Sequence, residues 1–148
     1  MQNKEKWPTL SVSDFDRDLI GEIRKANGVL KSIDQKNLLL IAAAIALKYD
    51  LREDPDKHTG SNDVIHASYL NSNEYNEYRQ YILLIYYFTK ANKNLSVMNN
   101  LNDITKNFID YAHRGLLYLK MIYLDGDNGD AAIMKEYGKY LSLNKPER

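Results

Sequence analysis

Acidic residues and histidines gather in one stretch of the chain, where they could hold a metal ion or act as a general acid and base. Asp54, Asp56 and His58 are near neighbours, and His66 follows eight residues after His58. Carboxylate and imidazole groups are common ligands of hydrolytic metal centres. A metal-dependent hydrolase that uses residues 50–66 is therefore one interpretation. A solvated acidic loop explains the same composition without chemistry.

A second acidic stretch has part of the spacing of a calcium-binding loop. Asp125, Asp127 and Glu136 occupy the first, third and twelfth positions of an EF-hand loop. The sixth position of that loop must be glycine because the backbone turns sharply there, and this chain has Asp130 instead. We interpret the stretch as a helix–helix connection in which glycines end one helix and Asp130 caps the next.

Other catalytic motifs are missing from the sequence. There is no cysteine, which removes disulfides, thiolate zinc sites and cysteine nucleophiles. None of the three histidines is three or four residues from another, and the seven glycines never form a phosphate-binding loop. We therefore expect a protein that is not an enzyme and that needs no metal and no other cofactor.

Tyrosine is unusually frequent, with 12 residues among 148. Its ring favours burial while its hydroxyl favours water, so tyrosines collect at core boundaries and at interfaces. Most of them are explained by the boundary of a helical core. Those that fall off the main apolar stripes, together with two arginines, form our candidate partner-binding set: Arg52, Tyr86, Tyr87, Arg114, Tyr118 and Tyr140.

Five segments repeat apolar residues at three- and four-residue steps, which predicts a helix in each. They are residues 14–25, 34–49, 73–90, 100–124 and 130–141. The predicted fold class is all-α, a single compact bundle of about five helices that spans residues 1–148. Residues 50–63 are predicted to form a long loop, and residues 1–13 and 143–148 to be flexible ends.

Helix start signals precede two of these segments. Ser11 or Ser13 precedes the first, in which Phe15, Leu19, Ile20 and Ile23 are predicted to share the buried face. Ser32 and Gln35 have the spacing of a capping box before the second, and Asp34 is a competing cap.

Two of the predicted helices have almost no polar face. Leu38–Leu47 is apolar nearly all round, and its alanines would let neighbouring helices approach closely. In residues 73–90, Tyr81, Leu84 and Phe88 add a second apolar stripe, which predicts that this helix is also largely enclosed. A chain of 148 residues has difficulty enclosing two such helices completely. We therefore expect another chain to cover some of this apolar surface.

Charge and hydropathy favour a cytoplasmic protein without a membrane segment. The chain has 20 basic and 20 acidic residues, so its net charge is not expected to attract the phosphate groups of nucleic acid. Its start is polar and charged, unlike a signal peptide. The apolar runs are shorter than the roughly 20 residues that span a bilayer. A small DNA-binding protein that uses Arg and Tyr side chains on one helix face stays an alternative.

The layout of residues 14–124 resembles one group of proteins. The apolar segment Val29–Leu47 precedes a loop with Arg52, and Ile104–Leu119 contains the pattern acidic-Tyr-Ala-x-x-Gly at Asp110–Gly115. These features resemble the small helical accessory proteins that accompany bacterial DNA phosphorothioation (Dnd-type) and related anti-phage operons. The resemblance implies a non-catalytic accessory subunit that docks onto a larger ATPase or nuclease subunit.

The leading hypothesis is therefore an interaction subunit of a bacterial antiviral defence complex. Its expected partner is a larger protein subunit or a second copy of the chain, with nucleic acid reached through that complex.

Overall fold

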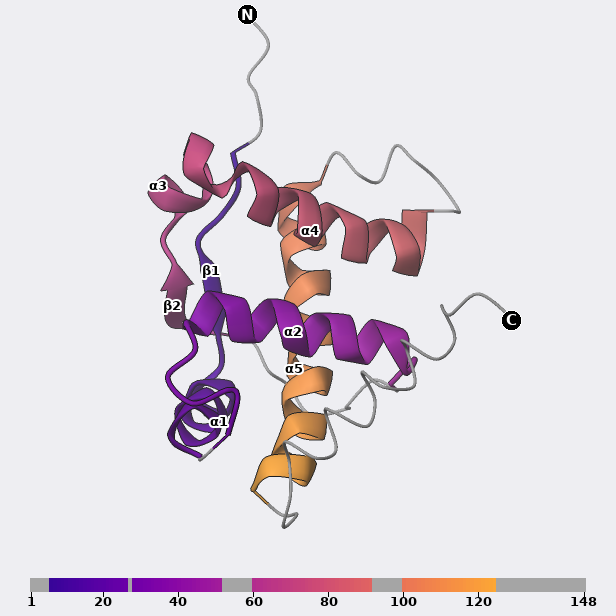
Figure 1. Ribbon diagram of the computed structural model, residues 1–148. Coiled ribbons are helices and arrows are strands. Elements are labelled where there is room, and N and C mark those ends of the chain that lie inside the picture. Colours follow the sequence, from indigo (N-terminus) through magenta and orange to yellow (C-terminus); the bar gives the residue numbers. More distant parts are fainter. Residues whose placement is uncertain (1–5, 27, 52–59, 92–99, 125–148) are drawn as a thin grey trace, which may run out of the picture.

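The computed structural model describes residues 6–26, 28–51, 60–91 and 100–124, and these form five α-helices and a two-stranded sheet (Figure 1). Along the chain the elements are β1 (Leu10–Val12), α1 (Asp14–Lys25), α2 (Gln35–Lys48), β2 (Asn62–Ile65), α3 (Ala67–Leu70), the 3-10 helix η1 (Asn73–Tyr75), α4 (Asn76–Tyr86), the π-helix η2 (Tyr87–Ala91) and α5 (Leu101–Tyr123).

Four predicted helices are confirmed within one or two residues at each end. The third of them, over residues 73–90, is built from η1, α4 and η2. The helix predicted at residues 130–141 and the end at 143–148 lie outside the described residues. The single turn of α3 was not predicted, since four residues are too few to show a helical period.

The expectation of a purely all-α fold is wrong, because a small sheet is present. β1 and β2 pair antiparallel, with Leu10 opposite Ile65 and Val12 opposite Asn62. Strands of three and four residues carry too little alternation to show a period of two in the sequence. The end of the predicted loop at residues 50–63 is also strand, because Asn62 and Asp63 belong to β2.

The N-terminal segment is anchored within its described part, which corrects the expectation that residues 1–13 are flexible. Trp7 N donates to Asn71 Oδ1 at 2.9 Å, and Asn71 Nδ2 donates back to Trp7 O at 2.9 Å. Leu10 and Val12 of β1 are buried in the core. The Trp7–Asn71 hydrogen bonds and the pairing of β1 with β2 therefore join the start of the chain to residues 50 or more positions later.

Helix α5 is the centre of the fold, and α1, α2 and α4 all pack against it. In Figure 1, α2 and α4 run in similar directions, and each crosses α5. At the α2–α5 crossing Gly115 lies directly against the backbone of Ala42, so an added Cβ would overlap the Ala42 carbonyl. The prediction that small residues of this segment allow close approach is confirmed here.

The helix starts differ in how they are capped. Ser13 caps α1, since its side chain accepts from Asp16 N at 3.1 Å. The capping box predicted from Ser32 and Gln35 does not form, because Ser32 has a left-handed backbone (φ 61°) and Asp34 takes the N-cap position. Asp34 makes no side-chain capping bond.

Tyr78 joins α4 to the two other central helices. Its hydroxyl donates to Lys36 O in α2 at 2.7 Å, and its ring meets Phe108 of α5 edge-on at 6.1 Å between centroids. Burial, with a smaller contribution from Tyr75, raises the pKa of Tyr78 far above the ordinary value near 10. The folded chain therefore keeps this proton at a pH where the unfolded chain releases it.

We expect Tyr78→Phe to change the pH dependence of stability in alkaline solution. Because the pKa of Tyr78 is raised in the folded state, its contribution to the free energy of unfolding is fully present below about pH 10. This contribution declines as the pH rises above that value. At pH 7 the substitution should cost about 1 kcal/mol, for the lost hydrogen bond to Lys36 O. Urea unfolding from pH 7 to pH 11 should show this deficit shrink as pH rises. A deficit of the same size throughout would contradict the assignment.

Candidate interaction surface

The outward side of α4 and η2 carries large apolar side chains in contact with solvent. Tyr81, Leu84, Tyr87 and Phe88 are 52%, 47%, 44% and 64% exposed. With the exposed polar residues Glu77 and Gln80, they share one side of the helix by their spacing of three and four. We call these six residues the α4 face.

The α4 face differs from the expectation that residues 73–90 are largely enclosed. One apolar stripe, which includes Tyr78, Ile82 and Ile85, packs into the core. The second stripe, with Tyr81, Leu84 and Phe88, faces solvent. Among the described elements, α4 packs against α5 and α2 through the first stripe, which leaves the second stripe outside these contacts.

The aromatic residues at the end of this helix are ordered relative to each other. The rings of Tyr87 and Phe88 meet edge-on, with 5.6 Å between centroids and an angle of 80° between planes. They lie at the start of η2, where the α-helix widens into a π-helix. Large aromatic side chains that contact each other supply apolar area for binding at little further entropy cost.

The four described residues of the predicted partner-binding set do not form one exposed surface. Tyr87 is on the α4 face, but its neighbour Tyr86 is only 2% exposed and belongs to the core, which corrects its selection. Tyr86 follows Ile82 and Tyr78 at four-residue steps, so its spacing already placed it on the buried stripe. Arg52 and Tyr140 lie outside the described residues.

The remaining two members, Arg114 and Tyr118, lie together on α5 beside the end of α2. The Tyr118 ring stacks on Tyr49, with centroids 5.5 Å apart and planes inclined by 24°. The Arg114 guanidinium lies 4.3 Å from the centroid of Tyr111 and donates to Leu51 O at 3.3 Å. These side chains are half-buried and engaged within the chain, so they fix α2 on α5 rather than present a free surface.

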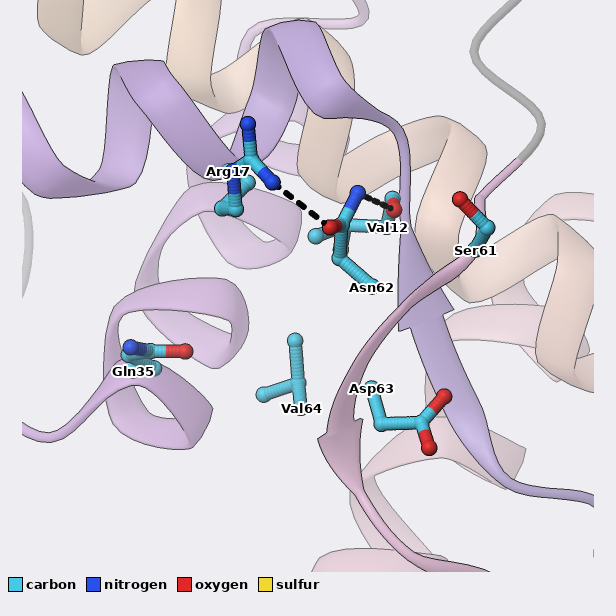
Figure 2. A pocket seen from close by; sticks show the side chains of 7 residues that line it. All are labelled: Val12, Arg17, Gln35, Ser61, Asn62, Asp63 and Val64. Atoms are coloured by element: carbon cyan, nitrogen blue, oxygen red, sulfur yellow. Dashed lines mark hydrogen bonds between the residues drawn. The ribbon is translucent and has the colours of Figure 1, made fainter.

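A polar pocket of about 410 Å³ lies beside the sheet (Figure 2). Its lining comes from β1, α1, the start of α2 and the stretch around β2: Val12, Arg17, Gln35, Ser61, Asn62, Asp63 and Val64. The guanidinium group of Arg17 in this pocket already makes hydrogen bonds within the chain. It donates to Asn62 Oδ1 at 2.9 Å and to Asp18 Oδ1 at 3.2 Å. Its charge is therefore matched by neighbouring side chains and is not directed at a ligand.

A buried pair of polar side chains joins α1 to α5. His113 Nδ1 and Asp16 Oδ1 are 2.6 Å apart, and the two residues are 2% and 1% exposed. The ring of Phe15, which the sequence placed in the core, is 53% exposed and meets the His113 ring edge-on. Because neither member of the pair reaches solvent, it can hold the helices together but cannot meet a substrate.

The sequence analysis missed this pair, although a signal was present. Asp16 precedes Leu19, Ile20 and Ile23 at helical steps, so it lies on the apolar stripe of α1. His113 likewise lies beside Ala112 and Leu116 on the buried side of α5. A polar residue on an apolar stripe indicates a buried hydrogen-bond partner. The sequence does not show which residue that partner is, because the two members of this pair are 97 positions apart.

The loop proposed for hydrolytic chemistry is described only at residues 50–51 and 60–66. Asp54, Asp56 and His58 lie outside the described residues, and the His66 ring accepts from Ser68 N as the cap of α3. Within the four described ranges, no group of three or more His, Cys, Asp or Glu residues is placed to hold a metal ion.

Comparisons with protein-family models, with curated proteins and with solved structures found no match. None of the helices in the described part of the chain is both long enough and apolar enough to cross a membrane.

Proposed function

We propose that this protein is a non-catalytic interaction subunit that docks another polypeptide on the α4 face. The observation that carries the proposal is the row of four half-exposed apolar side chains on one side of one helix. An exposed apolar patch that is bordered by polar residues is typical of a protein-binding surface. The proposal needs no catalytic group.

The composition of the α4 face favours a protein partner over nucleic acid. Tyr81, Tyr87 and Phe88 are the residue types that dominate binding energy at protein interfaces. The one charged residue among the six is Glu77, and a carboxylate repels the phosphate backbone. Direct binding of DNA through this face is therefore not what we propose.

The resemblance to Dnd-associated accessory proteins supplies the class of partner. A larger ATPase or nuclease subunit of an anti-phage complex would present an apolar groove, and α4 would lie in it as an amphipathic helix. Tyr81, Leu84 and Phe88 would be the anchors, since they follow each other at steps of three and four.

We expect Leu84→Glu to weaken this docking strongly without unfolding the protein. Leu84 lies in the middle of the α4 face and is 47% exposed, so a carboxylate is hydrated in the free protein and desolvated in the complex. Affinity for a larger subunit that co-purifies with the wild-type chain should fall at least about thirtyfold, the effect of losing one interface hot spot. The measurement is calorimetric titration of the purified partners.

Met121→Glu is the matched control. Met121 is also a large apolar residue on a helix and is 54% exposed, but it lies on α5 outside the α4 face. Its substitution should leave the affinity unchanged. Equal losses in the two variants, or none in Leu84→Glu, would contradict the assignment of this face.

A further inference from the structure

We propose that, when no larger subunit is bound, the α4 face is covered by the α4 face of a second copy, in an antiparallel helix pair. This inference rests on the proposed function, since it assigns a partner to the same surface. The pairing is self-complementary about a two-fold axis that passes beside Leu84.

The spacing of the apolar residues makes the antiparallel register complementary. Leu84 lies midway between Tyr81 and Tyr87 in the sequence. With the axis beside Leu84, the two leucines face each other and Tyr81 of each copy faces Tyr87 of the other. Phe88 of each copy then covers Gln80 of the other. Aromatic and aliphatic side chains therefore meet from position 81 to position 87, where they can interdigitate as in other helix pairs.

The charge on the face selects antiparallel over parallel pairing. Glu77, seven residues before Leu84, is the one charged member of the α4 face. In a parallel pair the two Glu77 carboxylates would face each other across the interface. In the antiparallel pair they lie at opposite ends, about 20 Å apart along the helix axis, where each stays hydrated.

The area of the face determines how strong the pairing is. The four apolar side chains are about half exposed and together offer about 400 Å² per copy, given 150–250 Å² for a large side chain. Two copies would cover about 800 Å² of apolar surface, which is below the range of stable specific interfaces, about 1,200–2,000 Å², and typical of weak, transient contacts. We therefore expect a weak, reversible dimer, which leaves the face accessible to a tighter-binding partner.

Sedimentation equilibrium of the purified full chain tests the dimer. We expect a concentration-dependent monomer–dimer equilibrium, a Kd at least about tenfold weaker in Leu84→Glu, and an unchanged Kd in Met121→Glu. A wild-type chain that stays monomeric to about 1 mM would overturn the inference. A dimer that is indifferent to Leu84→Glu would overturn it too.

Disulfide formation between introduced cysteines tests the register, since the chain has no cysteine of its own. With oxidised glutathione, Leu84→Cys should crosslink to itself, and a mixture of Tyr81→Cys and Tyr87→Cys should yield the mixed dimer in excess of either homodimer. Tyr81→Cys that links mainly to itself would indicate parallel pairing and overturn the proposed register.

The two proposals fail in different ways. A monomeric chain whose binding to the larger subunit is lost in Leu84→Glu would overturn the second-copy inference and leave the proposed function intact. A Leu84-dependent dimer that the larger subunit neither binds nor dissociates would support the second-copy inference and contradict the proposed subunit role.

Discussion

Replacing Gly115 by alanine is expected to destabilise the protein by about 3 kcal/mol or more, although alanine is the better helix former. The new methyl group would overlap the carbonyl of Ala42, which is backbone and cannot rotate away. Relief requires α2 and α5 to separate along the most extensive helix contact of the fold. Separation loosens the packing of core residues such as Leu38 and Leu116 on both helices.

Gly21→Ala is the control, because Gly21 is also a glycine within a helix. No atom outside its own helix lies within 4 Å of the Cβ position at Gly21, so alanine adds only helix propensity. This variant should be more stable by about 0.5–1 kcal/mol. Urea unfolding of both variants should give changes of opposite sign. Equal changes would contradict the close approach of α2 and α5 at Gly115.

His113→Ala is expected to cost about 3–5 kcal/mol, because it leaves the Asp16 carboxyl buried without this hydrogen bond. The second carboxylate oxygen, Asp16 Oδ2, has no hydrogen-bond partner among the described residues, so little else compensates the loss. Asp16→Ala should cost a similar amount. The double variant should lose less stability than the two single losses added together. Once one member of the pair is absent, removing the other also removes a buried polar group that has lost its partner.

Asp18→Ala is the control for Asp16→Ala, because it removes an exposed acidic side chain from the same helix α1. Asp18 pairs with Arg17, but its side chain is 69% exposed, so the pair contributes about 1 kcal/mol at most. Chemical denaturation of the four variants and the wild-type protein at pH 7 measures each change in the free energy of unfolding. A loss in Asp16→Ala no larger than that in Asp18→Ala, or additive losses in the double variant, would contradict a coupled buried pair.

The sequence predicted α1 and α5 because their apolar periods extend over three turns or more, and α2 because a long apolar run follows a helix start signal. α1, α2 and α5 begin and end within a residue or two of the predicted bounds. The sheet was missed because β1 and β2 are too short to establish a period, and because their pairing depends on residues about fifty positions apart. Long-range pairing of this kind is a property of the fold and not of either segment alone.

The candidate site was only partly predictable. The sequence indicated that a chain of this length has difficulty enclosing two apolar helices completely, but periodicity alone cannot say which stripe of residues 75–88 faces the core. Packing against α2 and α5 decides it, and places Tyr86 inside and Tyr87 outside. Arg114 and Tyr118 were selected for their residue types, yet they are occupied by contacts within the chain.

Photo-crosslinking in living cells tests the central claim, that the α4 face docks a polypeptide, most directly. A benzophenone amino acid would replace Tyr81 or Phe88 on the α4 face, and Met121 on α5 as an equally exposed control. Because the photoproduct reports contact within a few ångströms, it marks the covered surface itself. We expect covalent protein adducts from positions 81 and 88 and none from 121. The absence of adducts at both α4 positions, or an equal yield at 121, would contradict the account.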